Sequence, residues 1–274
     1  MKYPDAVIIR ESEYDKTLRA FRSFVPRVMG TKLEMLALGI EEDTAQELWL
    51  RMTDDVAMLS DLFDRFKPES EVSRLNAATP FESRPISDTL REAIALSISY
   101  NKLTKGLFDI TRGRASGLRL DAANGTLSMD AGCTLDFGGF AKGYALKRMK
   151  AMLEDAAVEN VIVNFGDSTI LGHGRHPLSN GWPVSIVHPF SHTTLDEIIL
   201  RDETLSTSGN APAYSGHIID PRSGKKIGGS GLTTVLSPDP LDAEILSTAA
   251  TVANSEEVSY LSVIFPNANI TKYD

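Results

Sequence analysis

The chain has 274 residues, 42% of them hydrophobic and 24% charged, which is ordinary for a globular protein and allows one large domain or two small ones. Its formal net charge of −9 argues against a nucleic-acid-binding protein, which normally presents a basic face, and against docking on anionic lipid. Its single cysteine, Cys133, excludes an intrachain disulfide and a cysteine-rich zinc site.

Residues 1–26 are polar with scattered aromatic side chains, and we expect them to form a peripheral segment. Residues 1–16 lack the apolar region of a secretory signal, and no stretch of the sequence is long and apolar enough for a transmembrane segment. As written, the sequence predicts a cytoplasmic protein. A periplasmic or lipid-anchored location requires that a longer precursor lost its leader.

Two amphipathic helices are predicted in the first half of the chain. After a strand over 28–39, Thr44 and Glu47 have the spacing of a capping box for a helix that runs to about Phe66. A polar loop is expected at 67–80. Ser87 then caps a second helix, with an apolar stripe of Leu90, Ile94 and Ile98.

The second half predicts strands joined by short turns. Asn124-Gly125 between alternating segments indicates a hairpin, and a glycine-rich stretch leads into a helix from about 138. Further strands are expected near 161, 182, 194, 203, 218 and 231. Asp239 and Pro240 predict the start of a helix, and a helix end and a strand close the chain. This order favours an α+β fold with mixed, largely antiparallel sheets and flanking helices, forming a single domain over 1–274.

The stretch DFGGFAKGYA, residues 136–145, is the first candidate site. Its two glycines let the backbone approach a ligand, the helix that follows favours an anion at its N-terminus, and Lys142 adds positive charge. It does not match a phosphate-binding P-loop or a dinucleotide-binding glycine motif. The alternative is a tight turn with Lys142 in solvent.

Two later stretches carry polar side chains at turns. Asn164 and Gly166 end a strand, where the alternative is an ordinary β-turn. In 206–224, hydroxyl groups precede His217 and Asp220, and a histidine there could act as a general base. The alternative is a buried histidine bonded to a neighbour.

Two other groupings suggest metal ligands. The pairs His173/His176 and His188/His192 lack an acidic or cysteine partner at metal-site spacing, so zinc is not expected there. Glu244 and Thr248 lie one helical turn apart and offer the oxygen ligands that Mg²⁺ accepts. The alternative is a surface glutamate beside a threonine that lines the core.

Taken in order, these segments resemble one known family. The stretches MGT (29–31), SEVSRLN (70–76), GLFDIT (106–111), DFGGFAKGYA, NFGDS, GWPVSIVHP, STSG, HIIDPRSG and AEILSTA are similar to the motifs of the ApbE family, the FAD:protein FMN transferases. The resemblance extends from about Met29 to the C-terminus. It implies an ApbE-like, T-fold-related α+β domain that uses FAD and Mg²⁺ to attach FMN to a Thr or Ser of an acceptor flavoprotein subunit.

The resemblance also implies roles for particular residues. The family's metal ligands correspond to the backbone carbonyl of Ala141 and to Glu244 and Thr248. His217 corresponds to the residue proposed to activate the acceptor hydroxyl, and Asp220 and Lys142 complete the expected catalytic set. The flavin-binding residues implied are Met29, Thr31, Asp109, Thr111, Gly138, Gly139, Lys142, Asn164, Gly166, Thr207, Ser208, Gly209, His217, Ile218, Ile219 and Asp220.

Three departures from the family pattern fall at the ligand. Glu244 replaces the usual aspartate of the metal site and is one methylene longer. The segment between Asp109 and Asp136, which helps to enclose FAD in the family, is shortened. Asp167 replaces a glycine, and its carboxylate would repel phosphate. Two alternatives to FMN transfer therefore stay open: hydrolysis of FAD to FMN and AMP, and an inactive paralogue that binds a flavin or a partner.

Overall fold

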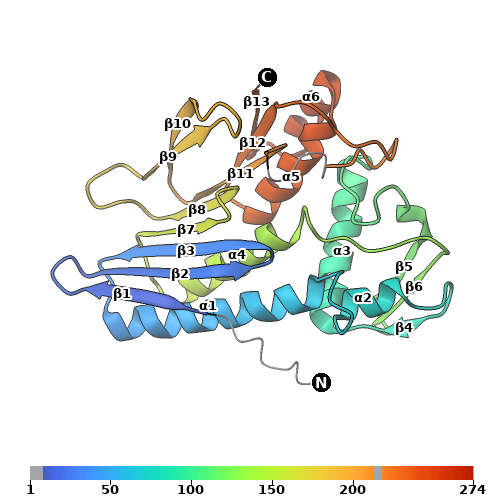
Figure 1. The fold of residues 1–274 in the computed structure, drawn as a ribbon, viewed down its shortest axis with the longest axis horizontal. Coiled ribbons are helices and arrows are strands. Elements are labelled where there is room, and N and C mark those ends of the chain that lie inside the picture. Colours follow the sequence, from blue (N-terminus) through green and yellow to red (C-terminus); the bar gives the residue numbers. More distant parts are fainter. Residues whose placement is uncertain (1–8, 213–217, 274) are drawn as a thin grey trace.

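The computed structural model describes residues 9–212 and 218–273, and an eight-stranded antiparallel sheet forms its centre (Figure 1). Its strand order is β1-β2-β3-β7-β8-β11-β12-β13. The strand bounds are β1 Glu11–Asp15, β2 Ala20–Val28, β3 Thr31–Leu38, β7 Val161–Phe165, β8 Thr169–His173, β11 Glu203–Gly209, β12 Leu232–Ser237 and β13 Asn269–Tyr273. Every neighbouring pair in this sheet is antiparallel.

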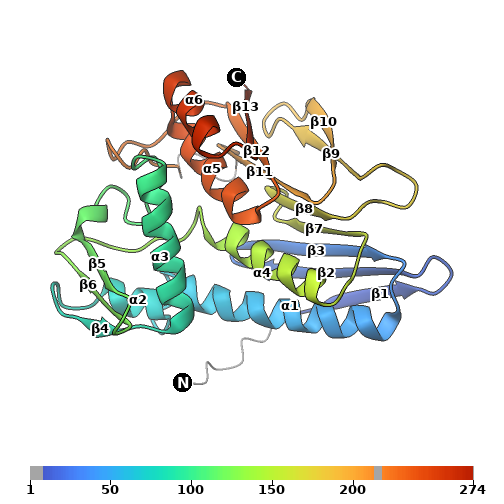
Figure 2. The same ribbon diagram turned by 180° about the vertical axis from the view of Figure 1, so that it is seen from behind.

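Helices cover one face of this sheet. Figure 2 shows α1 (Glu42–Phe63) and α4 (Ala141–Asp155) lying across it, with α5 (Pro240–Val252) and α6 (Ser255–Ile264) beside the last strands. The opposite face carries the hairpin of β9 (Trp182–Val187) and β10 (Thr194–Leu200).

A smaller layer lies at one end of the molecule. It contains α2 (Glu71–Asn76), α3 (Asp88–Leu103), the short 3₁₀ helix η1 (Ala115–Gly117) and a three-stranded sheet in the order β4-β6-β5. The strands are β4 (Arg84–Pro85), β5 (Leu118–Asp121) and β6 (Thr126–Met129). The predicted Asn124-Gly125 hairpin is the turn between β5 and β6, and it is confirmed.

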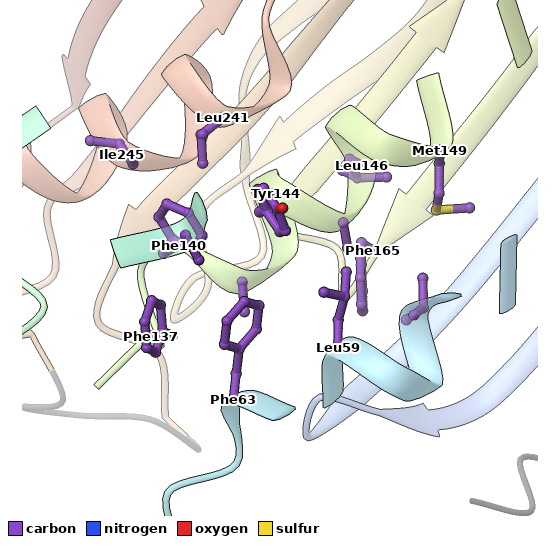
Figure 3. Packing of buried hydrophobic residues seen from close by; sticks show 14 of the residues in the cluster. Leu59, Phe63, Phe137, Phe140, Tyr144, Leu146, Met149, Phe165, Leu241 and Ile245 are labelled. Atoms are coloured by element: carbon purple, nitrogen blue, oxygen red, sulfur yellow. The ribbon is translucent and has the colours of Figure 1, made fainter. Parts of the chain in front are cut away.

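An aromatic cluster fixes the start of α4 against the end of α1 (Figure 3). The ring of Phe63 stacks on Phe137 with centroids 4.5 Å apart, and Phe140 stacks on Tyr144 at 5.2 Å. All four side chains are buried, and each contributes on the order of 2 kcal/mol through burial of apolar area. The backbone that enters α4 is therefore held by packing on its inner side.

The start of α5 was predicted correctly. Asp239 is its N-cap, with the Oδ1 atom accepting the backbone N–H of Leu241 at 2.9 Å, and Pro240 is its first residue. Ser87 likewise caps α3, as expected. The α+β fold with flanking helices is also confirmed.

The prediction that residues 1–26 are peripheral is wrong for the described part of that segment. β1 and β2 extend the main sheet, and Phe21 and Val25 are buried in its core. The reason is the period-two alternation of β2, in which Phe21, Ser23 and Val25 point toward the helices while Arg22 faces the other side.

Helix boundaries near α1 also differ from expectation. α1 begins at Glu42, its N-cap Glu41 makes no side-chain capping bond, and the helix ends at Phe63. The Thr44 capping box is therefore wrong, because Thr44 already lies inside the first turn. The loop expected at 67–80 contains α2, whose N-cap Ser70 accepts the N–H of Ser73.

Within residues 9–212 and 218–273, none of the helices combines the length and the hydrophobicity that a bilayer crossing requires.

Candidate active site

Glu244 forms a buried ion pair with Lys142 where α5 meets the first turn of α4. Glu244 is 3% exposed, and its Oε1 atom accepts from the Lys142 ammonium at 2.5 Å. Its Oε2 atom accepts the hydroxyl of Thr169 on β8 at 2.5 Å and that of Ser206 on β11 at 3.2 Å. The alternatives of a surface glutamate and of a solvated Lys142 are therefore wrong.

A row of hydroxyl groups continues from this carboxylate along the inner face of the sheet. Ser206 lies 3.0 Å from Ser247 of α5, oxygen to oxygen, and Ser247 lies 2.8 Å from Ser208. Ser208 belongs to the predicted flavin-binding turn. Its side chain faces α5 and reaches Glu244 through the hydroxyl groups of Ser247 and Ser206.

The three residues predicted as metal ligands, Ala141, Glu244 and Thr248, lie at the same junction. Ala141 is the first residue of α4, and Thr248 is half-buried, with its hydroxyl donating to the Glu244 carbonyl at 3.2 Å. A Cβ on Gly139 would lie 3.0 Å from the Thr248 hydroxyl oxygen, so the glycine-rich turn passes directly beside it.

The donor set at this junction suits a hard cation. A carboxylate, a hydroxyl and a backbone carbonyl are oxygen ligands, and Mg²⁺ in proteins is commonly held by one or two carboxylates, with water and phosphate completing its shell. In the described part of the chain no three His, Cys, Asp or Glu side chains cluster as a metal site. A cation here therefore relies on Glu244, whose carboxylate already faces Lys142.

The turn between β7 and β8 is closed by its own polar side chains. The Asn164 amide donates to Glu34 at 2.8 Å and to Asp167 at 2.7 Å, while its oxygen accepts the Asp167 N–H. Lys32 bridges Glu34 and Asp167 at 3.0 Å each. The hydrogen bond that Lys32 donates to Glu34, with the hydrogen bond and charge of Asp167, outweighs desolvation and raises the pKa of Lys32. Asp167, the carboxylate expected to repel phosphate, thus has a cationic partner in Lys32.

Three further predicted residues, Met29, Thr31 and Thr207, lie at the strand ends next to this turn. A Cβ on Gly166 would lie 2.6 Å from Thr31, so the β2–β3 and β7–β8 turns touch. Met29 packs against the core, and its N–H donates to Ser60 of α1 at 3.3 Å. The Thr207 N–H donates to the Ser168 carbonyl at 2.7 Å, which places the end of β11 next to the β7–β8 turn.

Asp109 and Thr111 form a turn rather than an open binding surface. The Asp109 carboxylate accepts the N–H of Thr111 at 2.7 Å, its hydroxyl at 2.6 Å and the N–H of Gly113 at 2.8 Å. Thr111 is buried. This turn meets the glycine-rich turn because Arg112 bonds Asp136, whose other oxygen accepts the Gly138 N–H.

Asp220 is held by Arg222 within a tight turn. Its Oδ1 atom accepts the Arg222 N–H at 2.9 Å and Nε at 3.0 Å, and the Gly224 N–H donates to its carbonyl. Burial alone raises the pKa of the Asp220 carboxyl, but the bonds and charge of Arg222 together outweigh it, so that pKa lies below its usual value. Of the strand predicted there, the described residues show one bridge, between Ile219 and Lys226.

The residues around Asp220 are closely packed. Ile218 is buried, and His217 lies outside the described residues. The Pro221 carbonyl lies 2.1 Å from where a Cβ on Gly113 would stand, so this turn abuts the turn of Asp109. Gly209 is equally confined, because a Cβ there would lie 2.5 Å from Leu232.

Among the described residues, contacts between neighbouring turns connect the β2–β3 turn, the β7–β8 turn and the end of β11, and the glycine-rich turn contacts α5. The sequence reasoning did not include Thr169, Ser206 or Lys32, which bond Glu244 and Asp167. Sequence spacing could not indicate that Thr169 and Ser206 contact Glu244, because each lies more than 35 positions from it along the chain.

A cavity of about 530 Å³ lies beside Asn164 on the sheet face away from α1. Its lining residues belong to β1, β2, β3 and β7 and include Arg22, Phe24 and Glu34. Of the residues expected to bind flavin, its lining contains Asn164.

The two histidine pairs lie elsewhere, with His176 against Trp182 and His188 against Phe190.

Comparison with known proteins gives a consistent set of relatives. A family model described as the ApbE family matches residues 29–119 and 114–264. An FAD:protein FMN transferase of Rhodobacter capsulatus is 29% identical over 92% of this chain, and the chain spans 47% of that relative's length. An FAD:protein FMN transferase of Klebsiella pneumoniae (strain 342) is 21% identical, over 84% of this chain and 78% of the relative.

Two solved structures share the fold. The ApbE protein of Thermotoga maritima superposes with a TM-score of 0.78 at 20% identity, covering 96% of this chain and 93% of its own. The flavin transferase ApbE of Vibrio cholerae gives a TM-score of 0.78 at 21% identity, covering 96% and 97%.

Proposed function

The chain belongs to the ApbE family, and from this premise we propose that it is a flavin transferase that moves FMN from FAD to a Thr or Ser of an acceptor flavoprotein. The observation that carries the proposal is the junction of α4 and α5. There the Lys142 ammonium, the first turn of a helix and an oxygen donor set lie together, beside turns that carry the family's motifs. Such an arrangement suits a substrate with a pyrophosphate group.

The reaction requires one bond to form and one to break. The acceptor hydroxyl oxygen attacks the phosphorus on the FMN side of the pyrophosphate, the bond to the AMP oxygen breaks, and AMP leaves. The hydroxyl is a weak nucleophile, so its proton must pass to a base. We assign that base to His217, with Asp220 shaping the turn that follows it.

Charge at the phosphates is the second requirement. Negative charge grows on the departing AMP phosphate, and positive groups placed there in advance lower the barrier. We assign this role to Lys142 and to the backbone N–H groups of the first turn of α4, which follow Gly138 and Gly139.

We further propose that the reaction depends on Mg²⁺. The Ala141 carbonyl, the Glu244 carboxylate and the Thr248 hydroxyl would hold the cation, because these oxygen groups lie at one junction. When bound, Mg²⁺ supplies positive charge against the pyrophosphate.

The flavin is proposed to lie along the end of the main sheet. Thr31, Asn164, Gly166 and Thr207 come from β3, from β7 and the turn after it, and from β11, and they lie at neighbouring strand ends there. Asp109 and Thr111 contribute by shaping the adjoining turn rather than by facing the ligand, since their polar atoms bond one another.

The test is to mix the protein with FAD and Mg²⁺, then Mn²⁺, with and without a peptide that carries one Thr. The proposal predicts AMP release and covalent flavin on the peptide, and no covalent flavin on the same peptide with Val in place of Thr. AMP release with free FMN, independent of the peptide, would instead identify a pyrophosphatase. No product and no change in flavin fluorescence with either cation would identify an inactive paralogue.

A further inference from the structure

The ion pair between Lys142 and Glu244 occupies the carboxylate on which the proposed cation depends. Resting on the function proposed above, we infer that Lys142 and a divalent cation are alternative partners of Glu244. The cation binds when the Lys142 ammonium leaves the carboxylate. Lys142 is then free to face the phosphate groups of the substrate.

The hydrogen bonds of Glu244 imply that the cation and Lys142 compete for the same side of its carboxylate. The side of the carboxylate toward the sheet is held by Thr169 and Ser206, so the carboxylate is anchored and does not turn away. Lys142 bonds the other oxygen at 2.5 Å, and its side chain is 20% exposed against 4% for Glu244, so it approaches from the solvent side. A cation shared with Thr248 and Ala141 must approach the same carboxylate.

Charge makes simultaneous binding unfavourable. An ammonium and a divalent cation on one carboxylate repel each other, and burial at this site weakens the screening by water and salt. Lys142 also has an alternative partner available. It belongs to the first turn of α4, where backbone N–H groups and the helix dipole favour a bound anion. A substrate phosphate at that turn would receive the displaced ammonium.

The experiment measures cation binding in the absence of FAD, so its outcome is independent of flavin transfer. Mn²⁺ is the probe, titrated into the full chain and followed by electron paramagnetic resonance of the free ion. The test variant is Lys142→Gln, which removes the charge and keeps a hydrogen-bond donor for Glu244. The matched control is Lys147→Gln on the same helix, where the lysine pairs with Asp239 instead.

Lys142→Gln is expected to bind Mn²⁺ about tenfold more tightly than the unchanged chain, and Lys147→Gln within about twofold of it. Lys142→Arg is expected to bind Mn²⁺ more weakly than the unchanged chain, because a guanidinium holds a carboxylate through two parallel bonds. This second variant retains the ion pair and so covers the case in which Lys142→Gln does not fold.

A further variant, Glu244→Gln, removes the carboxylate charge and is expected to lose Mn²⁺ binding. The inference is overturned if Lys142→Gln binds Mn²⁺ no more tightly than the unchanged chain, or if Lys147→Gln tightens binding equally. It is also overturned if Lys142→Arg binds as tightly as Lys142→Gln, or if Glu244→Gln binds Mn²⁺ like the unchanged chain. Failure of flavin transfer alone, with these affinities as expected, would overturn the proposed function and leave the competition intact.

Discussion

At the scale of single residues, the partners of the Glu244 carboxylate are what the sequence did not indicate. By the resemblance, Glu244 stands where an aspartate is expected, and its extra methylene was expected to disturb the proposed metal site. The structure places that carboxylate on hydroxyl groups of β8 and β11 and on Lys142. These partners were not predictable from the sequence, because they depend on how α5 lies on the sheet.

Thr169→Val tests how strongly the sheet anchors this carboxylate. The change leaves a buried carboxylate oxygen short of one donor, so the free energy of unfolding should fall by about 1–3 kcal/mol. Denaturant unfolding measures it. Thr204→Val is the matched control, because Thr204 is buried on the same inner face and, within the described structure, its hydroxyl has no hydrogen-bond partner. An equal loss in both variants would contradict the anchoring role of Thr169.

Asp167→Gly tests whether the carboxylate at the β7–β8 turn opposes the phosphates of FAD. The backbone φ of Asp167 is 54°, which glycine adopts without strain, and removing the negative charge should tighten FAD binding about fivefold to tenfold. Quenching of flavin fluorescence measures the affinity.

Asp202→Gly is the control for Asp167→Gly. Asp202 has the same φ of 54°, and it bonds Gly174 past the opposite end of β8. FAD affinity should therefore stay nearly unchanged in this variant. Similar tightening in both variants would show an effect of net charge rather than of the turn.

At the scale of elements, helices with a local start signal were predicted well and contacts between helices were not. Asp239-Pro240 and Ser87 are capping signals that act within three residues, and both were confirmed. α1 lacks a side-chain cap, so the sequence offered Thr44 as a false start. The contact of α4 with α5 depends on Gly143, whose role is visible only when both helices are in place.

Gly143→Ala tests that contact. A Cβ there would lie 2.4 Å from the Glu244 Cβ and 2.8 Å from the Pro240 carbonyl oxygen, so the helices must move apart. Overpacking costs about 1–3 kcal/mol, against a gain in helix propensity of about 1 kcal/mol. Thermal unfolding should therefore show a lower melting temperature, whereas Gly228→Ala, with no atom within 4 Å of the new Cβ, should not. An unchanged melting temperature for Gly143→Ala would contradict the close packing.

At the scale of the whole molecule, the α+β class followed from the order of helices and strands, but the extent of the sheet did not. The motifs of the family begin near Met29, and the two strands before it carry none, so residues 1–26 gave little signal beyond a short alternation. In the structure β2 pairs with β3 along most of its length and supplies core residues. We propose that the chain forms one domain that includes β1 and β2.

Phe21→Ala tests whether β2 belongs to that domain. Phe21 is 1% exposed, so its loss should lower the free energy of unfolding by about 3–5 kcal/mol. Phe24→Ala is the control, because Phe24 is half-buried on the other face of the same strand, and it should cost clearly less. Chemical denaturation followed by circular dichroism measures the free energy of unfolding of both variants. Equal small decreases in the two would show that β2 is peripheral to the domain.

Transfer of FMN to a hydroxyl group has a fixed stoichiometry, and measuring that stoichiometry is the sharpest test of the proposed function. FAD, Mg²⁺ and a Thr-containing acceptor are mixed with the protein, and AMP released is counted against FMN covalently attached to the acceptor. The expected ratio is one to one, and Glu244→Gln is expected to show no reaction. AMP released together with free FMN, and an acceptor that carries no flavin, would contradict it.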